Sequence, residues 1–211
     1  MENYTIVNNI QLLDDAGSDT IYGDRLPEMR TALGTMLSLI SELRCRLSDE
    51  LGSDPVDHCL ARIKTDRSMR DKCRRRKLPV TAESALTVIR DAIGIRIVCS
   101  FLDDVYRMRE AILDISGIEL LEEKDYIRHA KPNGYRSLHM IVRVNGGCSI
   151  ELQLRTISMD TWAALEHQIH YKKAGNPADS LIARELKRCA DELASTDITM
   201  QAIRDMLRSE T

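Results

Sequence analysis

The densest concentration of charge in the chain lies in the segment 62–77, which reads RIKTDRSMRDKCRRRK. It holds nine basic and two acidic residues, so its net charge is +7, whereas the formal charge of all 211 residues is −3. On a helix that begins near Asp66, one hydroxyl and three cations fall on the same side. These are Ser68, Lys72, Arg75 and Arg76. Such a surface predicts polyphosphate binding; a solvated charge run or a nonspecific nucleic-acid patch is the alternative.

Two carboxylates accompany two expected strands. Asp91 comes just before a β-branched run at 93–99, and Glu151 lies on the polar face of an alternating strand at 150–155. Mg²⁺ takes oxygen ligands, is usually held by one or two carboxylates, and leaves its other positions to water and substrate phosphates. Alone, each carboxylate is typical of a surface or capping residue. Together with the basic segment, the pair predicts phosphoryl chemistry.

A third group of candidate residues surrounds the turn KPNG at 131–134. Lys131 and Tyr135 bracket this turn, and His139 follows it at the start of an expected strand. An aromatic face beside cations can stack on a base while the cations meet phosphate, so the turn predicts nucleotide binding. A packing role for the tyrosine and a structural role for the histidine are the alternatives.

Other functions are disfavoured by the sequence. It contains no GxxxxGK[ST] phosphate loop and no GxGxxG fingerprint, and His167 and His170 lack the HExxH pattern of a zinc site. The six cysteines are at least fourteen residues apart with no CxxC, so we expect reduced thiols, mostly in the core of a cytosolic protein. No apolar run is long enough to span a membrane, and the N-terminal residues do not resemble a secretory signal.

The surrounding pattern indicates the elements that must position these residues. Apolar residues at three- and four-residue steps predict a helix at about 26–51. Strands are expected at 93–99, 118–128, 138–144 and 150–155, and further helices from Asp103 to about 115, at 158–171 and at about 179–208. We predict one α/β (α+β) domain over 1–211, a mixed sheet flanked by helices with its core at 58–172 and an added helix at each end.

Two of these elements carry further expectations. In the strand at 150–155, the apolar residues should face the core, while Glu151, Gln153 and Arg155 share the opposite face. In the last helix, apolar residues seven apart could pack within the chain or against another subunit, and the sequence leaves both open. They are Leu186, Leu193, Met200 and Leu207.

With these pieces in order, the chain resembles the synthetase domain of the RelA/SpoT family, in particular the single-domain small alarmone synthetases. The matching stretches are RIKTDRSMRDKCRRRKLP at 62–79, DAIGIRIVCSFLDDV at 91–105, DYIRHAKPNGYRSLH at 125–139 and ELQLRTISMDTWAALEHQIHYK at 151–172. The resemblance implies a nucleotidyltransferase-like mixed sheet flanked by helices. It also implies a GTP diphosphokinase of the bacterial stringent response, which transfers the β,γ-diphosphate of ATP to the 3′-hydroxyl of GTP or GDP, releases AMP and makes (p)ppGpp.

Roles for individual residues follow from this resemblance. It implies that Arg62 and Arg96 stack on the adenine, since a planar guanidinium stacks well. It implies ATP phosphate binding by Lys64, Ser68, Lys72 and Arg75. Asp91 resembles the Mg²⁺ ligand, and Glu151 the acid that holds the metal, accepts the proton of the 3′-hydroxyl, or both. Tyr135 resembles the guanine-stacking residue, with Lys124, Lys131, His139, Gln153 and Asp160 around the acceptor nucleotide.

The resemblance also carries expectations about partners. Small members of the family often form homotetramers through their terminal helices, so we expect a cytoplasmic homo-oligomer with ATP and GTP or GDP as substrates. We expect Mg²⁺ as cofactor and no membrane partner, and RNA binding is not indicated. No His-Asp dipeptide occurs, so synthesis without hydrolysis is expected. A relative that modifies the 3′ end of tRNA and an inactive nucleotide- or RNA-binding regulator are the alternatives.

Overall fold

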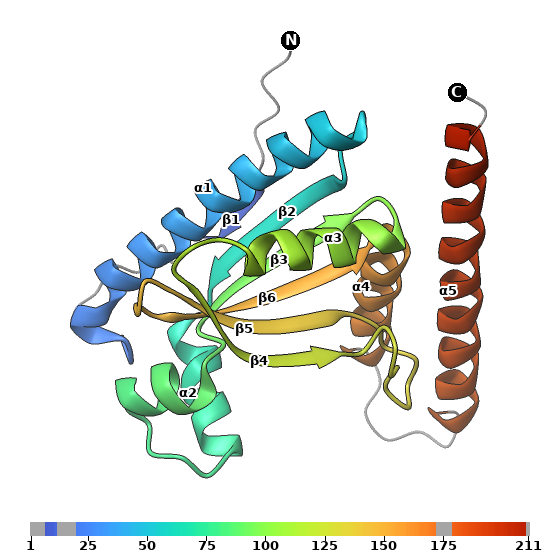
Figure 1. The fold of residues 1–211 in the computed structure, drawn as a ribbon. Coiled ribbons are helices and arrows are strands. Elements are labelled where there is room, and N and C mark those ends of the chain that lie inside the picture. Colours follow the sequence, from blue (N-terminus) through green and yellow to red (C-terminus); the bar gives the residue numbers. More distant parts are fainter. Residues whose placement is uncertain (1–6, 12–19, 172–178, 210–211) are drawn as a thin grey trace.

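The computed structural model describes residues 7–11, 20–171 and 179–209, which form a six-stranded mixed sheet with helices packed around it (Figure 1). The strands are β1 Val7–Gln11, β2 Val56–Ile63, β3 Ile93–Cys99, β4 Ile118–Asp125, β5 Leu138–Val144 and β6 Ser149–Thr156. They are ordered β1-β2-β3-β6-β5-β4 across the sheet. The β1–β2 and β3–β6 pairs are parallel and the other pairs antiparallel. The predicted mixed sheet flanked by helices is confirmed.

The helices agree closely with the sequence pattern. They are α1 Leu26–Leu51, α2 Asp66–Arg75, α3 Leu102–Leu113, α4 Ile157–Tyr171 and α5 Asp179–Ser209. The first has Pro27 in its first turn, where a missing N–H costs nothing, and is capped at its C-terminus by Gly52, whose φ of +68° suits glycine. In α2, Thr65 caps the helix by accepting a hydrogen bond from the Ser68 amide.

The core lies between the sheet and the helices α1 and α3. Helix α1 packs along β2, whereas α3 packs on β3, β4 and β6 (Figure 1). The strand β6 supplies Ile150, Leu152 and Leu154, which are fully buried, as predicted. Because side chains alternate along a strand, Glu151 and Gln153 are left on the other face of the sheet. All six cysteines are free thiols and four of them are buried.

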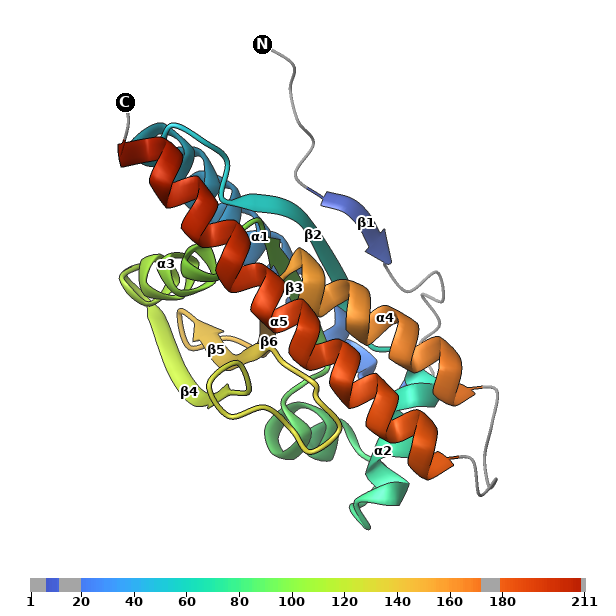
Figure 2. The same cartoon turned by 90° about the vertical axis from the view of Figure 1, so that its right-hand side faces the viewer.

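The last two helices lie side by side at one end of the sheet (Figure 2). The buried Asp197 of α5 accepts a hydrogen bond from Thr156 at the end of β6, 2.6 Å long, and the Trp162 indole of α4 donates to the Leu186 carbonyl. Farther along α5, Arg204 forms an ion pair with Asp103 at the start of α3. The C-terminal helix is therefore fastened to three different elements.

The apolar residues seven apart in α5 divide between the two predicted packing modes. Leu186 and Leu193 are half-buried, whereas Met200 and Leu207 are exposed. A straight α-helix rotates a seven-residue repeat by about 20° per heptad, so the series turns gradually away from the interior. The first half packs within the chain, and the second half faces outward.

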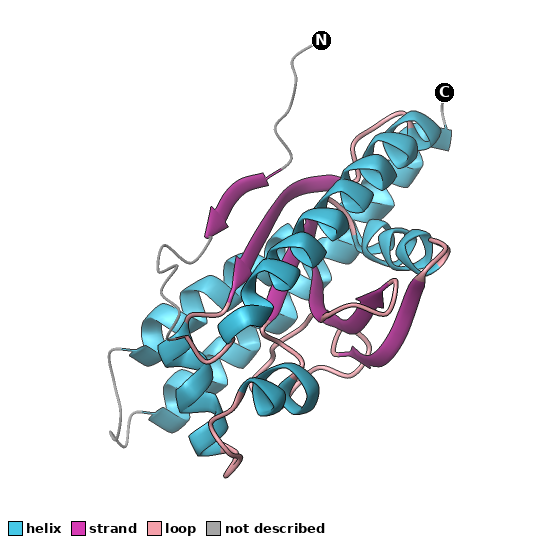
Figure 3. Cartoon of the chain, turned by 90° about the vertical axis from the view of Figure 1, so that its left-hand side faces the viewer, coloured by secondary structure: helices cyan, strands magenta, loops and turns pink. Residues whose placement is uncertain are grey.

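Four local features differ from the sequence expectation. Neither the edge strand β1 (Figure 3) nor its neighbour β2 was predicted as a strand, and the π-helical segment η2 at Ser84–Ile89 was not predicted. The strand expected at 118–128 ends at Asp125, because its carboxylate accepts hydrogen bonds from the amides of Ile127 and Arg128, both 2.9 Å long, and turns the chain. Local hydrogen bonding therefore overrides the apolar pattern at that point.

Candidate active site

Asp91 lies just before β3, beside the beginning of the basic helix α2. Its Oδ2 accepts a hydrogen bond from Lys64 Nζ at 2.7 Å and a second, short contact from Lys72 Nζ. Its Oδ1 is buried and has no hydrogen-bond partner among the described residues. Burial lowers the pKa of Lys64, while Asp91 counteracts that effect. One oxygen of Asp91 is thus held by two ammonium groups, and the other is left for a ligand.

Glu151 lies on β6 at the position that pairs with Gly94 of β3. Because Asp91 lies just before β3, the carboxylates of Asp91 and Glu151 are at the same end of the sheet. Its Oε2 accepts a hydrogen bond of 2.9 Å from the Gln153 amide, and its Oε1 lies 3.4 Å from His139 Nδ1. Burial raises the pKa of Glu151, but the contacts with His139 and Gln153 and the charge of Lys64 lower it to about 2. The side chain is therefore ionised at neutral pH.

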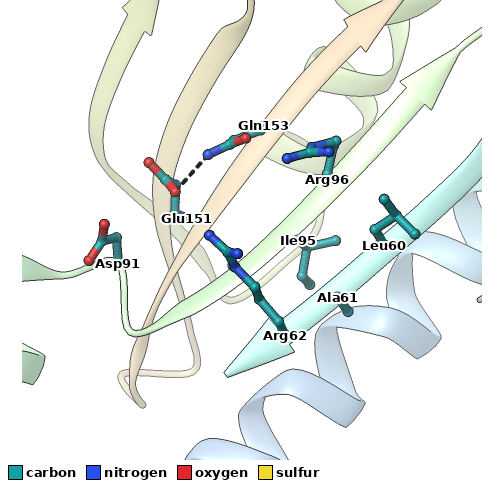
Figure 4. A pocket seen from close by; sticks show the side chains of 9 residues that line it. Leu60, Ala61, Arg62, Asp91, Ile95, Arg96, Glu151 and Gln153 are labelled. Carbon is teal, nitrogen blue, oxygen red and sulfur yellow. Dashed lines mark hydrogen bonds between the residues drawn. The ribbon is translucent and has the colours of Figure 1, made fainter. Parts of the chain in front are cut away.

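Two pockets meet at these carboxylates. The first, of about 240 Å³, lies over β2, β3 and β6, where Arg62 and Arg96 flank the floor (Figure 4). The second, of about 280 Å³, lies over β4 and β5 and includes His139. Asp91 and Glu151 line both pockets. Figure 4 shows Glu151 between Asp91 and Gln153, with Arg62 rising toward it from the end of β2. Two ligands could therefore meet at one pair of carboxylates.

The predicted turn carries an aromatic cluster beside the second pocket. The Gly134 amide donates to the Lys131 carbonyl at 2.8 Å, which closes the turn. Lys131 Nζ lies 4.5 Å from the centre of the Tyr126 ring and 4.8 Å from that of Tyr135. The Tyr135 hydroxyl is 2.8 Å from His139 Nε2. The turn therefore presents aromatic rings already paired with a cation, as base stacking beside phosphate requires.

Arg155 hydrogen-bonds three other side chains of the site, but the sequence did not predict it as a site residue. It is 4 % exposed, and its guanidinium donates to the Tyr135 hydroxyl at 2.6 Å, to Gln153 at 3.0 Å and to Asp160 at 3.1 Å. Its place on the polar face with Glu151 was predicted. Its burial was not, because the residues that enclose it come from a turn and a helix elsewhere in the chain.

The structure brings most of the predicted site residues to the two pockets. The first is lined by Arg62, Asp91, Arg96, Glu151 and Gln153, and the second by Lys72, Asp91, Lys124, His139 and Glu151. Arg76, which the sequence placed on the predicted polyphosphate surface, also lines the second pocket. Arg90 and Glu122 line this pocket too and were not predicted as site residues. Arg90 precedes Asp91 in the sequence, so its closeness to a predicted residue was the available signal.

Six predicted residues lie outside the linings of both pockets. Lys64 donates a hydrogen bond to Asp91, and the Tyr135 hydroxyl contacts His139, so these two touch lining residues. The Ser68 hydroxyl is bonded to Thr65, and Arg75 is exposed on α2. Lys131 lies over the aromatic rings of its own turn. Asp160 bridges Arg96 and Arg155, 3.1 Å from each, and is therefore placed between the two halves of the site rather than in the second pocket.

The donor set at the shared boundary fits Mg²⁺. The buried Oδ1 of Asp91 has no partner among the described residues, and β6, the strand that pairs with β3, supplies the ionised carboxylate of Glu151. No group of three or more His, Cys, Asp or Glu side chains arranged to hold a metal occurs in the described ranges. Two carboxylates are sufficient for Mg²⁺, which commonly retains water and substrate phosphates as its other ligands.

Comparisons of the sequence identify relatives over most of the chain. Residues 61–176 match the model of the region found in RelA / SpoT proteins. The GTP pyrophosphokinase YwaC of Bacillus subtilis is 34% identical over 180 residues, which cover 82% of this chain and 84% of that protein. The GTP pyrophosphokinase YjbM of the same organism is 29% identical over 182 residues, or 83% of this chain and 84% of that protein.

Comparisons of the structure agree with those of the sequence. Small alarmone synthetase 1 of Bacillus subtilis, solved with its product pppGpp, has a TM-score of 0.74 and 27% identity, with 87% of this chain and 96% of that chain covered. A GTP pyrophosphokinase family protein of Streptococcus pneumoniae has a TM-score of 0.75 and 28% identity, with coverages of 88% and 93%.

Proposed function

Because the chain belongs to the RelA/SpoT family, we propose that its two pockets hold the two nucleotides of a GTP diphosphokinase. The enzyme transfers the β,γ-diphosphate of ATP to the 3′-hydroxyl of GTP or GDP, releases AMP and makes (p)ppGpp. The observation that carries this proposal is the pair Asp91 and Glu151, which lines both pockets. A transfer between two bound nucleotides needs one such common boundary.

ATP occupies the first pocket. Arg62 and Arg96 lie on adjacent antiparallel strands and can stack on the two faces of an adenine. When ATP binds, the ammonium groups of Lys64 and Lys72 would leave Asp91 and bind the triphosphate, because it carries more negative charge than one carboxylate. Ser68 and Arg75 lie on the same helix, α2, and would contact the outer phosphates. These assignments are supported by the ion pairs of Lys64 and Lys72 with Asp91, which lines both pockets.

GTP or GDP occupies the second pocket. Tyr135 stacks on the guanine, with Lys131 and His139 beside it, and Lys124 on β4 meets the 5′ phosphates. Gln153 holds Glu151 in place by its 2.9 Å hydrogen bond. Asp160 orients Arg96 and Arg155, which places it at the junction of the two nucleotides. The arrangement brings the acceptor ribose toward Glu151.

Asp91 and Glu151 would hold the Mg²⁺ ion. When bound, it neutralises charge on the transferred diphosphate and its leaving group. The low pKa of Glu151 makes it a weak base in the absence of substrate, which favours holding the ion and orienting the 3′-hydroxyl over removing its proton in the ground state. The rest of the acceleration comes from aligning the 3′-hydroxyl with the β-phosphorus.

The decisive experiment measures transfer from γ-labelled ATP in the presence of Mg²⁺ and GTP, GDP, GMP or tRNA. We expect the label on GTP or GDP, and its loss in Asp91→Asn and Glu151→Gln, with the melting temperature kept within a few degrees. Glu119→Gln, an exposed carboxylate on β4 paired with Arg143, is the matched control and should remain active. Label on tRNA alone would establish the tRNA-modifying alternative, and no label at all would leave the inactive regulator.

The same proposal extends to assembly and location. Exposed apolar side chains gather on one side of α5, which we name the α5 stripe, and we propose that it joins subunits of a homotetramer in the cytoplasm. The α5 stripe consists of Leu181, Met200, Ile203, Met206 and Leu207. Searching the described residues finds no helix with the length and apolar character that a membrane crossing requires.

A further inference from the structure

We infer that the C-terminal helix α5 positions the acceptor turn at residues 131–136, so that Asp191 on this helix sets the affinity for GTP or GDP. The inference rests on the proposed function, in which Tyr135 and Lys131 of that turn contact the acceptor nucleotide. Neither the turn nor the helix contributes a lining residue to either pocket, but Tyr135 of the turn contacts His139, which lines the second pocket and not the first. The helix can therefore affect acceptor binding separately from ATP binding.

Arg136 makes the polar connection between the turn and the helix. Its side chain is 18 % exposed and donates to Asp191 Oδ1 at 2.9 Å and to the Ala190 carbonyl at 3.4 Å. The same guanidinium donates to the Gly134 carbonyl at 3.1 Å, inside the turn. One side chain thus joins the backbone of the turn to both a carboxylate and a carbonyl of α5.

Gly134 makes the close steric connection. Its φ of +94° lies in the region that favours glycine, and a Cβ at this position would lie 2.7 Å from the Cβ of Ala190 and 3.2 Å from the Cα of Lys187. The turn therefore rests directly on the backbone of α5, with no space for a side chain between them. A shift of the helix must displace the turn.

The turn is also held from the adjacent helix. Asn133 donates a hydrogen bond of 3.4 Å to Glu166 of α4, and α4 packs along α5. Asn133 in turn accepts a hydrogen bond from the Tyr135 amide at 3.2 Å. The position of the stacking tyrosine is consequently tied to the helix pair, more than thirty residues farther along the chain.

Asp191 is the residue through which this connection can be tested. It is shared between Arg136 and Lys187, both of which lower its pKa, and it does not line either pocket. An exposed ion pair is worth up to about 1 kcal/mol, so its loss should raise the KM for GDP roughly two- to fivefold. We classify Asp191 as a positioning residue because it acts through Arg136.

The experiment measures KM for GDP, KM for ATP and kcat in Asp191→Asn, Asp191→Glu and Glu192→Gln. Glu192 is the next residue of α5 and pairs with Arg188 on the exposed side, so its variant is the matched control. We expect Asp191→Asn alone to raise KM for GDP, with KM for ATP and the melting temperature unchanged, and Asp191→Glu to restore it. Hydrogen exchange of the turn should be faster in Asp191→Asn.

Each alternative result is decisive. An active wild type whose KM for GDP is unchanged by Asp191→Asn overturns the inference and leaves the proposed function intact. Equal rises in both KM values, or equal effects of Asp191→Asn and Glu192→Gln, would show a general role of the helix and also overturn it. A wild type that labels no guanosine nucleotide overturns the proposed function, and the inference with it.

Discussion

Arg155 shows how one buried cation can organise two adjoining pockets without lining either of them. Its guanidinium links Tyr135 after the turn at 131–134, Gln153 beside Glu151, and Asp160, which also bonds Arg96 of the first pocket. A planar group with five donors satisfies three partners in fixed directions, which a single ammonium cannot do. The site therefore depends on the planar geometry of the guanidinium as well as on its positive charge.

The substitution Arg155→Lys tests this role because it retains the positive charge and removes the planar guanidinium with its several N–H donors. We expect KM for GDP to rise about tenfold, since one lost hydrogen bond to a charged group costs about 1.5 kcal/mol. The rise in KM for ATP should be smaller, because Arg96 still bonds Asp160. Steady-state kinetics with each nucleotide varied in turn provides the measurement. Arg143→Lys, an exposed pair with Glu119, is the control, and equal behaviour of the two variants contradicts the assigned role.

Residue types and spacing were sufficient to indicate many of the charged residues that line the two pockets. The alternation of β6 placed Glu151 and Gln153 on one face, and the charge density of 62–77 drew attention to the segment that supplies Arg62 and Lys72. Two facts were beyond such reasoning. Lys72 contacts Asp91 across nineteen positions, and Arg155 is enclosed by Tyr135 and Asp160. Such contacts depend on which turns and helices pack together, and periodicity within a single element carries no information about that.

At the scale of elements, α5 is held to α3 by an ion pair between Arg204 and Asp103, which lie 101 positions apart in the chain. Arg204 binds both carboxylate oxygens of Asp103, 2.8 and 2.7 Å away, and covers the Phe101 ring at 4.4 Å. Asp104, Asp205 and Arg107 are the other charged groups at this contact. Burial raises the pKa of Asp103, but its bond to Arg204 and the charges of Arg107 and Arg204 lower it overall.

We expect Asp103→Asn to lower the free energy of unfolding by about 1–2 kcal/mol near neutral pH. Because the folded pKa is below the usual value of about 4, the pair stabilises the fold fully above pH 4 and loses this effect as the pH falls through the folded pKa. The difference between wild type and variant should therefore shrink below about pH 4. Urea unfolding across this range is the measurement, with Asp71→Asn, an exposed pair with Arg74, as control. A difference that grows toward low pH contradicts the argument.

At the scale of the whole molecule, the C-terminal helix has two faces with different partners. One packs against α4 and the start of α3, and the other carries the α5 stripe. Contiguous exposed apolar surface commonly marks a protein interface. The sequence identified the apolar repeat in this helix. The sequence could not show which of these residues are buried and which are exposed. That depends on how the helix is oriented against the rest of the chain, because a seven-residue repeat drifts around a straight helix with each heptad.

Ile203→Asp tests the proposed assembly through the α5 stripe. The side chain is 45 % exposed, so a charge there should leave the folding of the subunit intact while it disrupts subunit contact. We expect sedimentation to change from a tetramer to smaller species. Ile198→Asp makes the same substitution at an exposed position about 140° around the helix from Ile203, outside the α5 stripe, and should not dissociate the assembly. A wild type that sediments as a monomer contradicts the proposed tetramer.

The sheet order has a consequence for how independently the two pockets can be altered. The strands that flank the first pocket, β2 and β3, lie on one side of β6, whereas β5 and β4 of the second pocket lie on the other. The segment 118–144, which contains β4 and β5, is continuous in the chain and supplies no lining residue to the first pocket. Substitutions within this one segment can thus reshape the second pocket while they leave the lining of the first unchanged.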